Sequence, residues 1–139
     1  MTGSATHLDI DTSLCGRAER LAPGEADVVL TTTPAMAVDD RGLVHGGFVF
    51  GLADHAAMLA VNHPNVVLGS ANVKFTAPVR AGQSVRARAV LVRESGRKRE
   101  VEVEVFVLGD EGAEGEAVLL GTFNCAVLDR HVLDRSAGG

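Results

Sequence analysis

The chain has 139 residues, which suits a single domain, because domains commonly have about 100–150 residues. Hydrophobic residues make up 46% of it and charged residues 22%, as in ordinary globular proteins, so wholesale disorder is excluded. The formal net charge of −5 argues against nucleic acid or an anionic membrane as the main partner. We expect one domain over residues 1–139, with its core at about 17–128 and flexible polar ends at 1–14 and 129–139.

Two cysteines, Cys15 and Cys125, are too few for a disulfide framework, and no Cys or His spacing is typical of a metal site. We expect both thiols to act as small apolar residues in a reducing compartment. The N-terminus carries acidic residues and lacks the basic and apolar regions of a signal peptide. The longest apolar stretch, residues 46–61, is shorter than the roughly 20 residues that span a bilayer. We therefore expect a cytoplasmic protein without a metal.

Two strands open the predicted order, at residues 17–21 and 27–33. Pro23 and Gly24 lie between them and set the geometry of a turn. A polar linker then leads to His45.

One long helix is predicted at residues 46–62, because its length and its Ala, Leu and Met content favour a helix. Apolar residues occupy nearly its whole circumference, so we expect other parts of the protein to surround it. The sequence Asn62-His63-Pro64 should end it, since the residue before a proline disfavours the helical conformation.

Four further strands are predicted from alternating apolar and polar residues, at 66–78, 83–93, 100–108 and 116–128. This order of elements predicts an α+β fold, with an antiparallel sheet that curls around the long helix.

The strands at 83–93 and 100–108 form a predicted hairpin. Pairing Ala87 with Val103 collects apolar side chains on one face, and the same register sets Arg88 opposite Glu102. It leaves a three-residue loop whose last residue is a glycine in the left-handed conformation.

Asp54 is the only carboxylate in the otherwise apolar helix, and an unpaired buried carboxylate is costly. One interpretation is that Asp54 is hydrogen-bonded at an interface and only specifies packing. The other is a carboxylate that activates water or attacks an acyl carbon.

The sequence His45-Gly46-Gly47 stands at the start of the helix. Glycines there let a ligand approach backbone N–H groups at the positive end of the helix dipole, and such donors could stabilise an oxyanion. The alternative is a tight turn with close packing, and a single histidine is more often a structural hydrogen-bonding residue.

Asp54 lies nine positions after His45, and so roughly 180° around the helix and about 13 Å along it. One subunit can hardly bring its own glycine turn and its own Asp54 to one carbonyl group. If both act on one substrate, we expect them to come from two subunits across a two-fold axis.

The segment HGGFVFGLADHAAMLAVN, at residues 45–62, resembles the signature of hotdog-fold acyl-CoA thioesterases in the phenylacetyl-CoA thioesterase-like branch. That signature is approximately HGGxxFxLADxAxxxAxN. The downstream SANVKFTAPVRAGQSV also resembles that family, and the likeness covers about residues 17–128. The matching signature residues are His45, Gly46, Gly47, Phe50, Leu52, Ala53, Asp54, Ala56, Ala60 and Asn62.

The resemblance implies a hotdog fold that dimerises through its sheets and often assembles into tetramers. It implies hydrolysis of an acyl- or aryl-acyl-CoA to a free acid and coenzyme A, without a cofactor, because coenzyme A is part of the substrate. Asp54 is then the nucleophile or general base, and the backbone N–H groups of Gly46 and Gly47 polarise the carbonyl. His45 orients the turn or contacts the carbonyl.

Two positions depart from the relatives. Several relatives carry an asparagine where this chain has Asp39, and some use a serine or threonine where Leu68 lies, with Ser70 nearby. The choice between nucleophile and general base therefore stays open. We expect substrate contacts from Asp39, Phe50, Met58, Ser70, Asn72, Arg80, Arg97 and Lys98.

The basic cluster Arg97-Lys98-Arg99 follows the predicted hairpin loop, and Arg80 lies at another strand end. It is either a solvated loop in an acidic protein or a contact for the phosphates of coenzyme A.

The hotdog fold also serves two other functions. A non-catalytic acyl-CoA-binding protein would not need a catalytic carboxylate. A hydratase or dehydratase would place its histidine and acid differently. The acyl group stays open among aryl, medium-chain and short-chain types.

Overall fold

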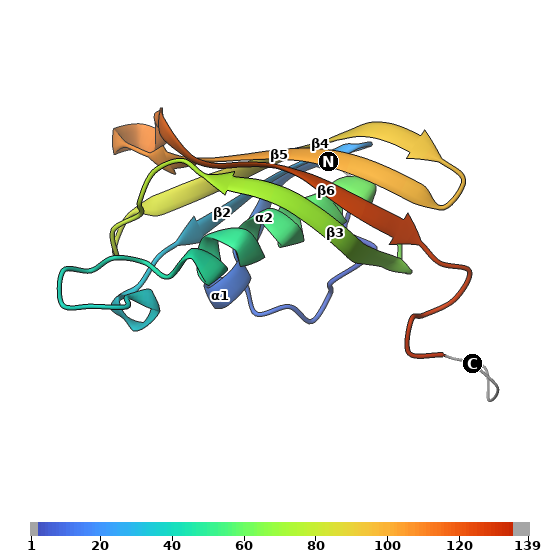
Figure 1. Ribbon diagram of the computed structural model, residues 1–139, viewed down its shortest axis with the longest axis horizontal. Coiled ribbons are helices and arrows are strands. Elements are labelled where there is room, and N and C mark those ends of the chain that lie inside the picture. The colour runs from blue at the N-terminus through green and yellow to red at the C-terminus, as the bar shows by residue number, and fades with distance from the viewer. Residues whose placement is uncertain (1–2, 135–139) are drawn as a thin grey trace.

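The computed structural model describes residues 3–134. A six-stranded antiparallel sheet curves over one long helix, α2, which lies on its concave side (Figure 1). The strands are β1 (Arg17–Ala22), β2 (Glu25–Thr31), β3 (Val66–Phe75), β4 (Ser84–Ser95), β5 (Lys98–Leu108) and β6 (Glu114–Val127). The helices are α1 (Thr12–Cys15) and α2 (Gly46–Val61), with short 3-10 turns at Pro34–Met36 and Asp110–Gly112.

The strand order in the sheet is β1-β2-β4-β5-β6-β3, so β1 and β3 are its edges. The chain leaves β2, passes along the concave face as α2, and returns as β3 at the opposite edge. This arrangement confirms the predicted α+β fold with a sheet around a central helix.

The core lies between α2 and the concave face of the sheet, because both surfaces are apolar. Nine of the helix's residues are buried, and Leu52, Ala53, Ala56 and Ala57 have no exposed surface. Fully burying a Val or Leu side chain stabilises a fold by about 1.5–3 kcal/mol. The helix ends where Asn62 adopts a left-handed conformation (φ 52°) and its N–H donates to the Met58 carbonyl. The sheet residues that complete the core are Val28, Leu30, Val85, Ala87, Ala89, Val101, Val103, Val105, Leu119 and Phe123.

The predicted register of the β4–β5 hairpin was wrong by two residues. Ala87 pairs with Val105, and Arg88 pairs with Glu104. A bulge at Val92 takes up one residue of β4, and the turn has only two residues, Gly96 and Arg97, with Gly96 left-handed (φ 59°). Because side chains alternate with a period of two, a shift of two residues keeps each one on its predicted face.

The predicted charge pairs on the outer face also differ. The Arg88 guanidinium contacts Asp27 (3.2 Å) and Glu114 (2.7 Å), and Arg86 contacts Glu19 (2.7 Å). The arginines therefore pair with carboxylates of β1, β2 and β6 and not with the glutamates of β5, and the residue opposite Arg86 is Phe106.

The segment before β1 was predicted as a flexible arm, and in the structure it lies against α2. The Asn62 side chain accepts a hydrogen bond from Ala5 N–H (2.7 Å) and donates one to the Gly3 carbonyl (3.0 Å). Thr6 is buried. The short helix α1, which the sequence analysis did not predict, begins with Asp11 accepting from the Ser13 N–H (2.9 Å).

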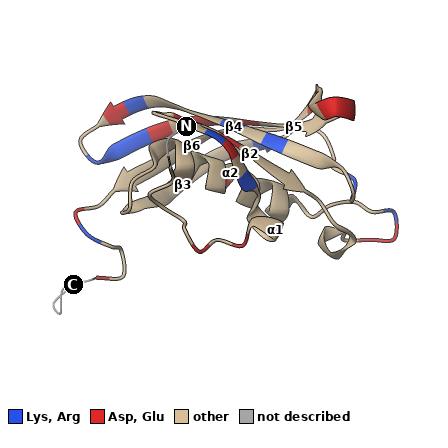
Figure 2. Cartoon of the chain, turned by 180° about the vertical axis from the view of Figure 1, so that it is seen from behind, with Lys and Arg blue, Asp and Glu red and all other residues tan. Residues whose placement is uncertain are grey.

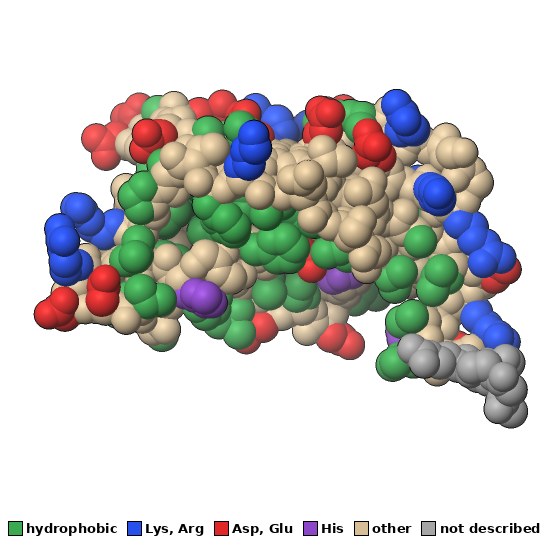
Figure 3. Space-filling view, viewed as in Figure 1, with side chains coloured by type: hydrophobic (Ala, Val, Ile, Leu, Met, Phe, Trp, Pro, Cys, Tyr) green, Lys and Arg blue, Asp and Glu red, His purple; other side chains and the backbone are tan. Residues whose placement is uncertain are grey.

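The concave face of the edge strand β3 is left uncovered. Ala71, Val73 and Phe75 share the α2 side of the sheet with Phe123 and its neighbours on β6, yet Ala71 is exposed and Phe75 is 54% exposed. Hydrophobic side chains gather along this side of the molecule, between the sheet and α2 (Figure 3). Within residues 3–134, no helix is both long and apolar enough to cross a membrane.

Candidate functional site

The turn at the start of α2 is held by backbone hydrogen bonds on both sides. The N–H of His45 donates to the Met36 carbonyl, and the N–H of Val44 donates to the Val79 carbonyl, both at 2.9 Å. The N–H groups of Gly46 and Gly47 are the first two of the helix, and no group within residues 3–134 accepts from them. Two oriented donors are thus available to a ligand.

Both glycines of this turn lie under aromatic rings. A Cβ at Gly47 would lie 2.8 Å from Nε2 of His45, so the exposed imidazole ring folds over the space that glycine leaves. A Cβ at Gly46 would lie 3.4 Å from the ring of Phe75 on β3. The absence of side chains here therefore keeps the His45 ring close to the helix start.

Asp54 lies in the middle of α2 and is half-buried. Its Oδ1 atom is buried without a hydrogen-bond partner, and among the described residues Arg86 Nε is the only other such side-chain atom. Burial raises the pKa of Asp54 above its ordinary value, and the neighbouring His55 partly opposes this shift. A desolvated carboxylate with a raised pKa suits proton transfer or nucleophilic attack.

Three residues that were not predicted as part of the site, His55, Cys15 and Cys125, lie close enough to Asp54 to interact electrostatically with it. His55 is buried, and its Nδ1 lies 3.0 Å from the Cys15 carbonyl oxygen. Burial, and then the charge of Asp54, raise the pKa of the Cys125 thiol to about 11, so this thiol stays protonated. His55 could have been predicted as a neighbour of Asp54, because it follows Asp54 directly in the sequence. Nothing in the sequence places Cys125 near Asp54.

Gly47 and Asp54 lie on the same side of α2. Their separation of seven residues is about two helical turns, which returns to nearly the same direction but leaves about 10 Å along the axis. Of these residues, only His45 lies at a rotation of about 180° from Asp54. The distance along the helix, and not the direction, therefore separates the donors from the carboxylate in one chain.

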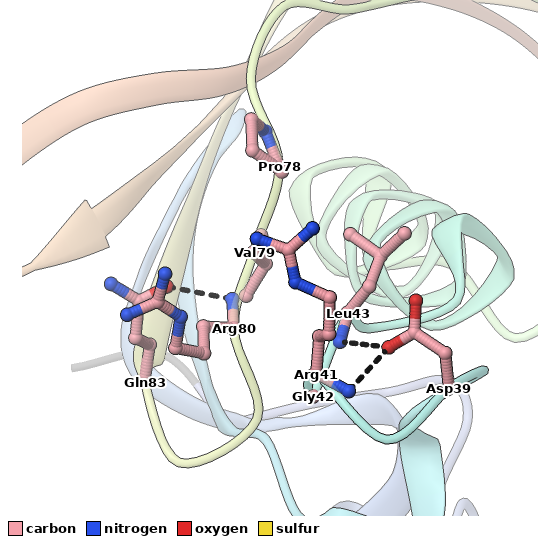
Figure 4. A pocket seen from close by; sticks show the side chains of 8 residues that line it. All are labelled: Asp39, Arg41, Gly42, Leu43, Pro78, Val79, Arg80 and Gln83. Atoms are coloured by element: carbon pink, nitrogen blue, oxygen red, sulfur yellow. Dashed lines mark hydrogen bonds between the residues drawn. The ribbon is translucent and has the colours of Figure 1, made fainter.

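Asp39 and Arg80 lie near this helix start. Asp39 Oδ1 accepts from the N–H of Arg41 (3.0 Å) and of Leu43 (3.2 Å), so the carboxylate shapes the loop. Arg80 bridges to Leu43 through backbone pairing. These residues line a pocket of about 420 Å³ with Arg41, Gly42 and Gln83 (Figure 4).

Four other predicted contact residues lie elsewhere. Phe50 is half-buried one turn before Asp54 and packs on Phe123 with ring centroids 5.5 Å apart. Met58 is 1% exposed and belongs to the core. Ser70 and Asn72 pair with Asn124 and Thr122 on the face of the sheet away from α2, because a bulge at Gly69 shifts the alternation. The structure therefore does not bring Ser70 and Asn72 to the Asp54 side of the sheet.

Arg97 and Lys98 lie at the tip of the β4–β5 hairpin, at the other end of the sheet from the loop before α2 (Figures 1 and 2). Arg97 forms an ion pair with Asp129, and Arg99 pairs with Glu94 at 3.0 Å. Lys98 lines a pocket of about 530 Å³ with Ser70 and Cys125. Among residues 3–134, no group of three His, Cys, Asp or Glu side chains could hold a metal ion.

The profile of the thioesterase superfamily matches residues 41–114, which include the glycine turn, Asp54 and Arg80. The structure is similar to the uncharacterized protein PH1136 from Pyrococcus horikoshii, with 48% identity, a TM-score of 0.90, and coverage of 96% of this chain and 98% of that one. It is also similar to a mutant of the phenylacetic acid degradation protein PaaI from Thermus thermophilus. That similarity has 37% identity, a TM-score of 0.72, and coverage of 83% of this chain and 95% of that one.

Two curated relatives match only in part. The chain is 50% identical over 111 residues to methylthioribose-1-phosphate isomerase of Aquifex aeolicus, covering 80% of this chain and 24% of that protein. It is 30% identical over 78 residues to the transcription factor FapR of Caldanaerobacter subterraneus, covering 56% of this chain and 39% of that protein. The chain thus spans about a quarter to two-fifths of the length of these relatives. With its profile match and its sheet wrapped around one helix, the chain belongs to the thioesterase superfamily and has the hotdog fold.

Proposed function

We propose that the protein hydrolyses the thioester bond of an acyl-CoA, with Asp54 as its catalytic carboxylate. The observation that carries this proposal is the buried Oδ1 atom of Asp54, which lacks a partner in the middle of an apolar helix. Within residues 3–134 of one chain no group satisfies this oxygen, and leaving it unsatisfied would cost about 1–3 kcal/mol, so it is available to a water, a substrate or a second subunit. Membership of the thioesterase superfamily supports this chemistry.

The N–H groups of Gly46 and Gly47 are proposed to hold the thioester carbonyl oxygen, whose negative charge grows as the carbon is attacked. In one form of the reaction, Asp54 takes a proton from water while the water oxygen bonds to the carbonyl carbon. The C–S bond then breaks, and the coenzyme A thiolate takes up the proton. In the other form, an Asp54 oxygen attacks the carbon, the C–S bond breaks and coenzyme A leaves as the thiolate. Water then hydrolyses the acyl-carboxylate anhydride, which restores the Asp54 carboxylate, releases the acid and supplies the proton that the thiolate takes up.

Because about 10 Å separates Gly47 from Asp54 in one helix, we propose that two subunits share each site. The side of α2 that bears Gly47, Gly51 and Asp54 is not fully covered. A Cβ at Gly51 would meet nothing within 4 Å, which leaves room for a second helix. A two-fold axis beside Gly51 would set Gly47 of each chain opposite Asp54 of the other.

The uncovered edge strand β3 supports the same homodimer. Its concave face exposes Ala71 and Phe75, and its outer edge offers unpaired backbone groups. Pairing of two β3 strands across the axis would continue the sheet and cover these apolar side chains. Assembly of such dimers into tetramers stays a prediction from the family resemblance.

Mixing two inactive variants tests the shared site. Asp54→Asn removes the carboxylate, and Gly47→Pro removes one donor in the first turn of the helix, where no intrahelical hydrogen bond is lost, and also displaces the His45 ring of the same chain. After unfolding and joint refolding, half of the dimers are mixed and each holds one intact site, so about one quarter of wild-type activity should return. A mixture that stays as inactive as its parents, with both variants folded and dimeric, would refute the shared site.

The second candidate is an acyl-CoA-binding regulator without catalysis, which the similarity to the transcription factor FapR favours. Such a protein would bind coenzyme A thioesters and release no thiol. Sugar-phosphate isomerisation is not proposed, since the chain spans only 24% of that isomerase. Release of free coenzyme A from an acyl-CoA panel separates hydrolysis from binding.

A further inference from the structure

A pocket next to the glycine turn presents two arginines from different segments. Arg41 comes from the loop before α2, and Arg80 from the segment between β3 and β4 (Figure 4). The pocket encloses about 420 Å³ and is lined by Asp39, Arg41, Gly42, Leu43, Pro78, Val79, Arg80 and Gln83.

Neither guanidinium in this pocket has an ion-pair partner within the described part of the chain. Both arginines are exposed. The only carboxylate in the lining, Asp39, accepts backbone N–H groups with its Oδ1. Carboxylates pair with Arg20, Arg86, Arg88, Arg97 and Arg99, whereas Arg17, Arg93 and Arg130 resemble Arg41 and Arg80 in having no such pair within residues 3–134.

The backbone beneath the two arginines is fixed. Leu43 and Arg80 form an antiparallel bridge, and the Ala81 N–H donates to the Gly42 carbonyl at 2.7 Å. Gln83 accepts from the Arg80 N–H at 2.8 Å. Gly42 has φ 80°, which favours glycine over other residues. The backbone contacts therefore fix the distance between the Cα atoms of Arg41 and Arg80.

The pocket continues toward the proposed catalytic turn. An adjoining apolar pocket shares Pro78 and Val79 with it and reaches Gly46 and Phe75. A ligand could therefore place an anionic group at the arginines and extend an uncharged arm past Val79. Its far end would then meet the free N–H groups of Gly46 and Gly47.

We propose that Arg41 and Arg80 bind the phosphate groups of the coenzyme A portion of the substrate, an assignment that rests on the proposed function. Each planar guanidinium offers several N–H donors in a geometry that matches phosphate oxygens. The alternative phosphate contact, at Arg97 and Lys98, has its arginine already paired with Asp129. Strand β4 begins at Ser84, directly after the pocket residue Gln83, and ends at the hairpin. Its length of roughly 37 Å separates the hairpin from the pocket.

The test measures coenzyme A binding by calorimetry with the full chain, because binding does not depend on turnover. The Arg41→Ala/Arg80→Ala variant should bind coenzyme A roughly 10- to 100-fold more weakly than wild type, and its salt dependence should flatten. The control variant, Arg97→Ala/Lys98→Ala, loses the same formal charge and should stay within about twofold of wild type. Affinity for pantetheine, which has no phosphate, should be the same in all three proteins.

Both arginines are exposed, so circular dichroism should show wild-type folding in the Arg41→Ala/Arg80→Ala variant. Unchanged coenzyme A binding by this variant, or an equal loss in the control, contradicts the phosphate site. Arginine-dependent binding without thioester hydrolysis would leave the site standing and refute the proposed catalysis. Thioester hydrolysis together with coenzyme A binding that does not depend on Arg41 and Arg80 would refute the phosphate site and leave the proposed catalysis standing.

Discussion

The ring nitrogen Nδ1 of His55 lies 3.0 Å from the carbonyl oxygen of Cys15. A carbonyl only accepts, so Nδ1 carries a proton and donates it. The bond ties the residue after Asp54 to the end of α1. His7, from the N-terminal segment, stacks on the same ring with centroids 6.1 Å apart. The helix that bears the proposed catalytic carboxylate is thus fastened on its C-terminal half by the segment before β1.

This arrangement predicts a loss of stability in acid. Burial lowers the pKa of His55, so protons bind the unfolded chain more readily than the folded one. The free energy of unfolding should therefore be highest above about pH 6.5, where His55 is neutral in both states. It should decrease as the pH falls from 6.5 toward the lower pKa that His55 has in the folded protein. The charged and titratable groups that act on His55 are His7 and Asp54.

Thermal melts of wild type and His55→Asn between pH 5 and 7.5 test this coupling. Asparagine keeps a donor near the position of Nδ1 and does not titrate. The melting temperature of the variant should depend less on pH over this range. Parallel curves for the two proteins would mean that His55 does not titrate differently on folding.

Asp54→Asn should make the protein more stable at neutral pH. Burial raises the pKa of Asp54, so the folded state disfavours the charged carboxylate, and stability contributed by this residue falls as pH rises above about 3.8. Removing the charge should add about 1 kcal/mol at pH 7, or roughly 3–5 °C in melting temperature. The gain should shrink as the pH falls through about 3.8, because protonation then removes the charge from the unfolded wild type as well, and a gain of undiminished size below this pH would point to another cause.

Gly47→Ala should lower activity through His45. The new Cβ would lie 2.8 Å from the imidazole, which must swing away, whereas the backbone at this position tolerates alanine. We expect kcat to fall about tenfold with an unchanged melting temperature. In a His45→Ala background the same substitution should have little further effect, because the ring is already gone. Independent, additive losses would show that His45 is not the residue displaced.

Gly51→Leu should weaken the dimer and the activity together. The space beside Gly51 is open in one chain but is proposed to hold the second helix. A branched side chain there should force the helices apart, while Gly51→Ala should be tolerated better. Analytical ultracentrifugation beside activity assays measures both effects. A dimeric and active Gly51→Leu protein would place the interface elsewhere.

Composition and periodicity predicted much of this fold, and local irregularities limited the rest. The helix predicted at 46–62 ends one residue earlier, at Val61, because Asn62 adopts the left-handed conformation. The β4–β5 register was mispredicted because a bulge inside β4 leaves no mark in an alternating pattern. A bulge at Gly69 likewise decides which way Ser70 points.

A candidate residue can be selected from sequence where its chemistry differs from that of its surroundings. Asp54 is conspicuous in an apolar helix, and its buried oxygen follows from that position. The sequence could not show whether Met58 lines a pocket or lies in the core, because nearly every side of α2 is apolar. The position of the sheet decides which side of the helix is buried. Arg41 stands alone in a polar linker, and only the bridge between Leu43 and Arg80 brings it near a second arginine.

Catalysis by Asp54 is measured most directly as steady-state release of coenzyme A from a panel of acyl- and aryl-acyl-CoA thioesters. It compares wild type with purified Asp54→Asn, whose fold is checked by circular dichroism. We expect hydrolysis by the wild type and a loss of at least about 100-fold in kcat in the variant. Turnover near the wild-type rate in a folded Asp54→Asn protein would contradict it.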